Sequence, residues 1–267
     1  MFVINKLRAD HVIDFAAEEL KKYLRMMMPE CGEVDIFYDP NAKTGFRLGL
    51  MSDFGMDPEV KDLYLDDVIY VKTDSAGGVI AGSNPRSVLQ AVYRFLKKQG
   101  CIWLFPGPDG EKIPMVKELK PVDYFHKAPL RYRGQCNEGS EIQRQMMDAI
   151  AFTPKIGLNT FMMEGDEPDG YYNNFYCHRW DNLESEGPIS KRTALQWKRA
   201  CEAEIAKRGL QFHDIGHGMI TDAFNLDCSN NKLTELDVTD CTSLEQLICN
   251  GNEILELDLS SCTQLHT

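Results

Sequence analysis

The sequence lacks a surplus of basic residues. Lysine and arginine together number 29 against 41 acidic residues, which gives a formal net charge of -12 over 267 residues. A protein with this balance has no excess cations to neutralise phosphates, so we expect no nucleic-acid partner. The charge is also uneven, because residues 221–267 carry nine acids and one base. This asymmetry favours a domain boundary near residue 220.

Long apolar runs are missing as well. No stretch approaches the roughly 20 residues that cross a bilayer, so no membrane partner is expected. Residues 1–8 lack the basic, apolar and small-residue order of a signal peptide, and they are typical of a first strand. The chain as written is therefore expected to be cytoplasmic, or secreted or periplasmic if its natural N-terminus lies further upstream.

Several catalytic and metal-binding motifs are absent too. The sequence has no glycine-rich phosphate loop, no nucleophile elbow and no zinc-finger spacing, and no cofactor is predicted. Its nine cysteines are an odd number, and four of them fall at equivalent positions of a repeat. We therefore expect reduced core cysteines rather than a disulfide framework.

What is present begins with a small α/β domain over residues 1–125. Apolar side chains recur at helical spacing, and Asp10 and Pro85 mark the two helix starts. Gly77-Gly78 favours a hairpin between two apolar runs, and residues 109–127 resemble a linker-like hairpin region. The predicted domain is a mixed sheet packed against two helices. Its expected helices are 9–28 and 86–99, and its expected strands are 2–7, 34–38, 46–51, 68–73, 79–82 and 101–105.

Residues 128–220 have a different predicted pattern, in which strands alternate with helices. Alternation of this kind predicts parallel strands joined by right-handed crossovers. Three strands are well short of a closed eight-stranded barrel, so we predict an incomplete (β/α) barrel. The expected strands are 130–136, 158–163 and 209–213, the expected helices are 140–153 and 190–208, and a polar loop occupies 164–189.

The last segment, residues 224–267, contains a repeat with a period of 21 residues. Ten positions match between its two copies, and they include Asn231 with Asn252 and Leu236 with Leu257. The pattern L-x-C-x-x-N-x-L resembles the Cys-containing leucine-rich repeats of bacterial surface proteins. In such a repeat Cys228, Cys241, Cys249 and Cys262 are buried spacers, not metal ligands. Two turns cannot bury a core alone, so a truncated array is expected.

Residues 1–218 resemble glycoside-hydrolase-like proteins related to family 67 α-glucuronidases and family 20 β-hexosaminidases. Residues 80–96, followed by 100–105, look like the end of the small α/β domain that precedes the catalytic barrel in those enzymes. Residues 128–134 look like the first barrel strand, where the family 20 pattern places a sugar-binding arginine before a glycine; here it is Arg133. Asp214-Ile-Gly-His217 looks like the end of the third strand, which helps to shape the sugar pocket.

This resemblance implies a substrate site but no complete catalytic one. Glycoside hydrolysis needs two carboxylates at a defined separation. In the related families these come from the fourth strand onward, and this chain leaves the pattern after the third. The expected substrate-binding residues are Arg133, Glu138, Glu164, Asp214 and His217, with no catalytic residue and no metal ligand predicted.

Each of these residues also has a structural alternative. Arg133 can hold a sugar through its planar donor fork or form an ion pair at the barrel mouth. Glu138, Glu164 and Asp214 can equally be solvated loop acids. The pair His213 and His217 has metal-ligand spacing, but the glycines beside it favour a loop. The aromatic loop 171–180 is either a carbohydrate platform or packed on itself, and Arg86 is expected at the surface or between domains.

Three functions remain open from the sequence. The first is a carbohydrate-active protein, the front part of a glycosidase for glucuronic-acid- or hexosamine-containing glycans, whose own hydrolase activity is not expected. The second is an interaction protein that binds a protein partner through the leucine-rich tail. The third is a chimera without independent activity. The first is favoured because the resemblance covers most of the chain.

Overall fold

The computed structural model describes residues 2–134, 143–164, 191–215, 225–227, 233–236, 238, 244 and 246–265. These residues form two units, Met1–Asp214 and Ile215–Thr267. The division of the chain into three domains stays a prediction. Within the described part of the chain, no helix combines the length and apolar character that a bilayer crossing requires.

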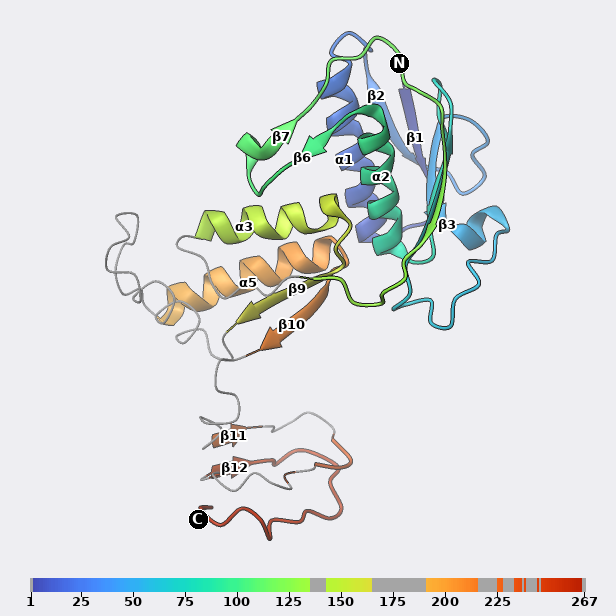
Figure 1. Cartoon of the computed structure of the whole chain (residues 1–267). Coiled ribbons are helices and arrows are strands. Elements are labelled where there is room, and N and C mark those ends of the chain that lie inside the picture. Colours follow the sequence, from blue (N-terminus) through green and yellow to red (C-terminus); the bar gives the residue numbers. More distant parts are fainter. Residues whose placement is uncertain are drawn as a thin grey trace. The chain divides into compact units, whose positions relative to one another are not determined.

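The first unit is built on a six-stranded mixed sheet (Figure 1). Its strand order is β2-β1-β3-β5-β4-β8, and the first four run parallel, whereas β4 is antiparallel to both of its neighbours. The hairpin predicted at Gly77-Gly78 is confirmed, because β4 and β5 pair on either side of it. The strands are β1 (Phe2–Lys6), β2 (Val34–Tyr38), β3 (Phe46–Leu50), β4 (Val68–Thr73), β5 (Gly78–Gly82) and β8 (Val122–Lys127).

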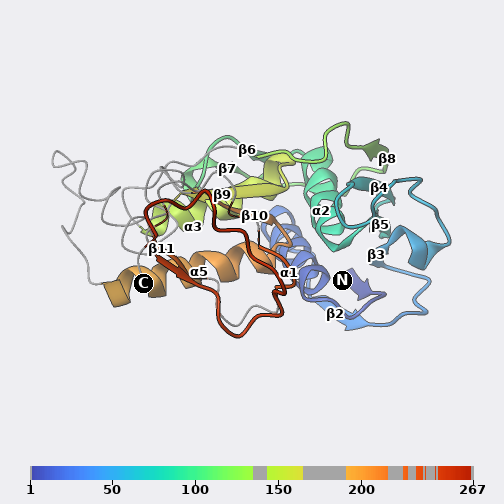
Figure 2. The ribbon, with the colours of Figure 1, turned by 90° about the horizontal axis from the view of Figure 1, so that it is seen from below.

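Two helices cover one face of this sheet, α1 (His11–Met27) and α2 (Pro85–Gln99) (Figure 2). Asp10 caps α1 by accepting hydrogen bonds from the backbone of Val12 and Ile13, as the sequence predicts. Gly100, at φ 109°, ends α2 in the left-handed region that glycine tolerates best. The buried faces of both helices share one apolar core with the sheet, and it includes the fully buried Tyr23, Phe46 and Phe95.

A smaller layer follows in the same unit, with helices α3 (Gln143–Phe152) and α5 (Lys191–Lys207) beside strands β9 (Thr160–Glu164) and β10 (Gln211–Ile215). The two strands form a sheet and run in the same direction (Figure 1). Their core is small: Met146, Ile150, Phe161, Met163, Cys201, Ile205 and Leu210. The C-terminal ends of β9 and β10 therefore lie at the same edge of this sheet.

Three sequence expectations need correction. Residues 122–127 are the edge strand β8, not a linker, and only Val122 is buried, so no apolar alternation marks the strand. The run 101–105 contributes only β6 (Ile102–Trp103), which pairs with β7 (Glu111–Lys112) outside the main sheet. Residues 130–134 form no strand, because the bonds between this segment and Asn159 involve its side chain as well as its backbone.

The second unit contains β11 (Asn225–Asp227) and β12 (Gln246–Ile248), which pair in parallel with Leu226 opposite Leu247. The pairing joins residues 21 positions apart, which is the period read from the sequence. Asn252 donates to the carbonyl of Cys249 and accepts from the amide of Leu233 at 2.9 Å. These contacts fit the backbone-bonding role expected of a repeat asparagine, while the assignment to leucine-rich repeats stays a prediction.

Candidate functional site

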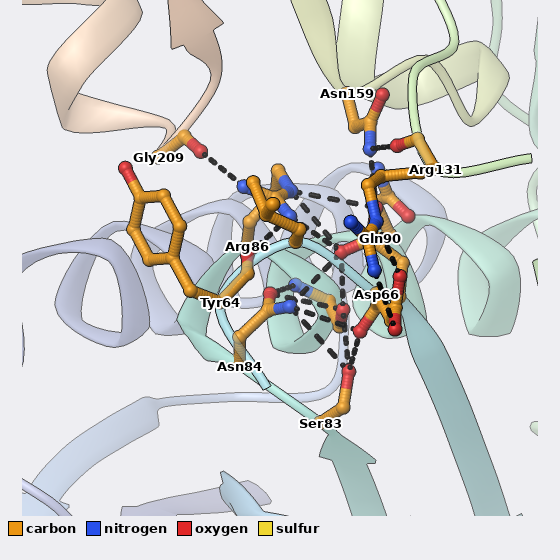
Figure 3. A network of polar contacts seen from close by, with 12 residues as sticks. Tyr64, Asp66, Ser83, Asn84, Arg86, Gln90, Arg131, Asn159 and Gly209 are labelled. Carbon is orange, nitrogen blue, oxygen red and sulfur yellow. Dashed lines mark hydrogen bonds and ion pairs between the residues drawn. The ribbon is translucent and has the colours of Figure 1, made fainter. Parts of the chain in front are cut away.

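A buried polar cluster surrounds Asp67, the residue directly before β4. Figure 3 shows this network, with Asn84, Arg86 and Asn159 among its labelled members. The side chain of Asp67 is only 2% exposed, and both carboxylate oxygens accept hydrogen bonds. The donors to Oδ1 are Asn84 at 3.0 Å, Arg86 at 2.8 Å and Ser87 at 2.9 Å, and those to Oδ2 are Arg133 at 2.6 Å and Asn159 at 2.7 Å. A buried charge needs such partners, because removal from water is costly without them.

Arg86 is the more deeply buried cation of this cluster. Its side chain is 4% exposed, so of the two expected positions, at the surface or between domains, the surface position is wrong. The first turn of α2 directs it at Asp67, because Asn84 caps the helix and Pro85 begins it. Its guanidinium also donates to the carbonyls of Tyr64 and Gly209, and the latter lies just before β10. Arg86 thus connects the sheet domain to the β9–β10 layer.

Arg133, the predicted sugar-binding residue, is engaged in structural contacts. Its Nη2 donates to Asp67 at 2.6 Å and to Gln90 at 3.3 Å. Nε donates to the carbonyl of Gly157 at 3.1 Å, and Nη1 donates to that of Leu130 at 2.7 Å. Most of the donors in the guanidinium fork are therefore already used within the protein. The contacts fit the ion-pair alternative, and this ion pair lies between the six-stranded sheet and the segment that precedes β9.

Asn159, which directly precedes β9, fixes the segment that contains Arg133. Its Oδ1 accepts from the backbone of Arg133 at 2.8 Å, and its Nδ2 donates to the carbonyl of Arg131 at 2.7 Å. Arg131 in turn pairs with Asp66 at 2.8 Å. Two adjacent aspartates therefore bind two alternate arginines, one pair buried and the other at the surface.

Both aspartates have a pKa below the ordinary value of an aspartic acid. Burial by itself would raise the pKa of Asp67, but the Arg86 charge and the hydrogen bonds from Arg86, Arg133 and Asn84 lower it below the ordinary value. A hydrogen bond from Arg131 lowers the pKa of Asp66. A saturated, ionised carboxylate can act neither as a general acid nor as an unhindered nucleophile, so Asp67 is a structural residue.

Two of the remaining site predictions, Glu164 and Asp214, fall at the ends of β9 and β10. Glu164 is the last residue of β9, and Asp214 is the penultimate residue of β10. Because the ends of neighbouring co-directional strands meet at one edge of a sheet, the fold brings these two positions to the same edge. Their side chains, together with Glu138, His217 and the aromatic loop 171–180, lie outside the described residues.

The neighbouring His213 is half-buried, and its ring meets that of Tyr132 edge-on at 5.9 Å between centroids. Among the residues that the structure describes, no group of His, Cys, Asp or Glu side chains could hold a metal ion. Cys31, Cys101, Cys249 and Cys262 are free thiols. Burial raises the pKa of the Cys101 thiol to about 12, so this cysteine is an unreactive core residue.

No sequence motif points to Asp67. The local feature there is the pair Asp66-Asp67 directly before an apolar strand, and an acid at such a position is ordinarily solvated. Arg86, directly after the Asn84-Pro85 helix start, lies 19 residues away in the sequence, and only the fold brings its side chain to Asp67.

No family model matches the chain, and no curated protein does. Solved structures do match. A mutant β-hexosaminidase of Streptomyces plicatus, in complex with the product GlcNAc, has a TM-score of 0.51 at 10% identity over 84% of this chain and 41% of its own. The family 20 β-N-acetylhexosaminidase of Streptomyces coelicolor has a TM-score of 0.43 at 11% identity, over 98% of this chain and 50% of its own.

A family 89 glycoside hydrolase of Clostridium perfringens, in complex with PUGNAc, has a TM-score of 0.43 at 12% identity over 76% of this chain and 24% of its own. The chain thus spans half or less of the length of these three proteins. At such identities the likeness concerns the fold alone. The mixed α/β fold of this chain is similar to the corresponding part of a glycoside hydrolase, the Streptomyces plicatus β-hexosaminidase.

Proposed function

We propose that the chain is a carbohydrate-active protein of glycoside-hydrolase ancestry that takes glycans containing hexosamine or glucuronic acid. The observation that carries the proposal is the fold likeness to a β-hexosaminidase over 84% of this chain. The chemistry of the β9 and β10 ends supports it, because acids and an imidazole follow two adjacent strands. In this proposal Glu138, Glu164, Asp214 and His217 line the sugar site. Arg133 supports the site through Asp67 rather than touching sugar.

We further propose that these 267 residues bind a glycan without hydrolysing it. Asp67 is held by two arginines, and the described Glu111 is held by Lys155 and Tyr23. Neither carboxylate is available for the acid and base roles that glycoside hydrolysis requires. Glu164 and Asp214 are then substrate-shaping residues.

The experiment measures binding and turnover on the same protein. Purified chain is placed on a glycan array and is assayed with aryl glucuronides and aryl hexosaminides. The proposal expects binding to a hexosamine or glucuronate glycan that Asp214→Asn with His217→Gln weakens about tenfold or more, given the usual strength of hydrogen bonds to charged groups. Aryl-glycoside turnover that the same double substitution abolishes would overturn the binding-only proposal. The absence of any glycan ligand would overturn the glycan proposal.

A second candidate function rests on the second unit. The parallel pairing of β11 with β12 at a 21-residue offset supports a repeat surface for a protein partner. If this is the function, deleting residues 221–267 should abolish partner binding and leave glycan binding unchanged. Loss of both activities on deletion would contradict a separate interaction module.

A further inference from the structure

The first unit contains a cavity that is lined by none of the residues proposed for the glycan site. It has a volume of about 140 Å³ and is lined by residues of α2, of the edge strand β8 and of the 3-10 helix η3 (Thr153–Ile156). We call it the α2 pocket. The charged and polar residues that line it include Asp67, Gln90, Arg94, Lys97, His126, Arg133 and Lys155.

One face of α2 builds the pocket wall. Gln90, Tyr93, Arg94 and Lys97 follow the spacing of three, four and seven residues that aligns side chains along a helix. Gln90 is buried at 7% exposure, so its amide fixes the inner end of the wall. Arg94 and Lys97 therefore stand side by side over the opening.

The pocket contains two positive charges, on Arg94 and Lys97, that are not neutralised by a carboxylate among the described lining residues. Its one carboxylate, Asp67, is already saturated by Arg86 and Arg133. Lys155 is paired with Glu111. In the described residues no carboxylate forms an ion pair with Arg94 or Lys97, and Arg94 instead lies over the Tyr124 ring at 4.9 Å. Two cations thus face one cavity without a counter-charge, in a chain whose net charge is -12.

The positive charges of Arg94 and Lys97 repel each other in this pocket. Burial, and then the charge of Arg94, lower the pKa of Lys97 below its ordinary value. A bound anion would remove this repulsion, because an opposite charge nearby favours the protonated amine. The volume also limits the ligand, since sites for drug-sized molecules begin at about 300 Å³. The pocket is large enough for a single acidic group.

We propose that the α2 pocket binds one oxyanion group, a sulfate, phosphate or carboxylate, between Arg94 and Lys97. The group is either a free inorganic ion or the acidic substituent of a sugar. This proposal does not depend on the glycan site at the β9 and β10 ends, because none of the four residues proposed for that site lines the α2 pocket.

Cations in the last turn of a helix also stabilise its dipole, and the test must separate that role from ligand binding. Lys98 is the matched control. It occupies the same last turn of α2 and also faces the Tyr124 ring, at 5.3 Å, but it does not line the pocket. Lys97→Gln and Lys98→Gln therefore remove the same charge from the same helix end.

Calorimetric titration of the full chain with sodium sulfate, sodium phosphate, sodium glucuronate and glucose, at constant ionic strength, measures the affinity. We expect saturable one-to-one binding of at least one of the anions and none of glucose. Arg94→Gln and Lys97→Gln should each weaken binding about tenfold or more, because charge-assisted hydrogen bonds are roughly twice as strong as neutral ones. Lys98→Gln should change it less than about twofold, since Lys98 does not line the pocket.

The anions also distinguish the two sources of the ligand. Preference for sulfate or phosphate over glucuronate would identify a free inorganic ion, and the reverse would identify an acidic sugar. Equal weakening by Lys97→Gln and Lys98→Gln would overturn the proposal, because it would show general attraction to the helix end. Absence of saturable binding for all three anions would overturn it as well. If no glycan binds on the array but sulfate still binds, the proposed glycan function would be wrong and the anion site would stand.

Discussion

Arg133 donates a hydrogen bond of 2.6 Å from Nη2 to Oδ2 of Asp67, a carboxylate that also neutralises Arg86. This contact joins the segment after β8 to the start of β4, and through Arg86 and Gly209 it reaches β10. One buried acid therefore links segments of the six-stranded sheet with the segment that leads into β10. The residue that the family resemblance implicates in sugar binding is here engaged in contacts within the protein.

Replacing Asp67 with asparagine tests this role. Asp67→Asn keeps the shape of the side chain but leaves Arg86 and Arg133 without a counter-charge. Because Arg86 is only 4% exposed, we expect the free energy of unfolding to fall by about 3–5 kcal/mol, the usual cost of breaking a buried ion pair. Urea unfolding followed by circular dichroism measures it.

The neighbouring aspartate provides the control for that substitution. Asp66→Asn removes an equivalent charge that pairs with Arg131 at the surface, where solvent screens the interaction. Its effect should be much smaller than that of Asp67→Asn. Equal losses would mean that charge at this chain position, rather than burial, determines stability.

Acid should destabilise the first unit through the same carboxylate. The pKa of Asp67 is lower in the folded protein than in the unfolded chain, so ionised Asp67 contributes stability above about pH 4. That contribution is lost as the pH falls through the folded-state value. The urea midpoint of the wild type should therefore drop steeply below about pH 4, and that of Asp67→Asn should drop less. If the urea midpoints of the two proteins fall in parallel with pH, ionised Asp67 does not provide this stability.

Gly209 connects this cluster to β10 and has a φ of 62°. A Cβ added there would lie 3.1 Å from Cγ2 of Val12 and 3.3 Å from Cβ of Arg86. We expect Gly209→Ala to destabilise the protein by about 1–3 kcal/mol, because left-handed backbone strain and crowding act together. Gly55→Ala is the control, since its φ is 71° but no atom lies within 4 Å of an added Cβ. A thermal-shift series should show the larger drop for Gly209→Ala, and identical drops would exclude crowding.

The elements that local patterns specify strongly were predictable from the sequence. The amphipathic spacing and end residues of α1 and α2 place their bounds within two residues of those observed. Strand β8 was missed because it is an edge strand with little apolar alternation. The Asp67 cluster could not be predicted, because Arg86 and Arg133 lie 19 and 66 residues away in sequence. A single acid before a strand is ordinarily solvated, and only the packing of three segments buries this one.

A hydrogen bond in the second unit provides a further test. The amide of Leu233 donates to Oδ1 of Asn252 at 2.9 Å, so this side chain replaces a backbone partner. Asn252→Ala should leave the amide without its acceptor and increase its hydrogen exchange about tenfold, in line with a hydrogen bond worth about 1 kcal/mol. Asn250→Ala, at an exposed position two residues earlier, should leave that amide unchanged. If both substitutions accelerate exchange equally, the repeat does not depend on its asparagine, and the resemblance to leucine-rich repeats loses its physical basis.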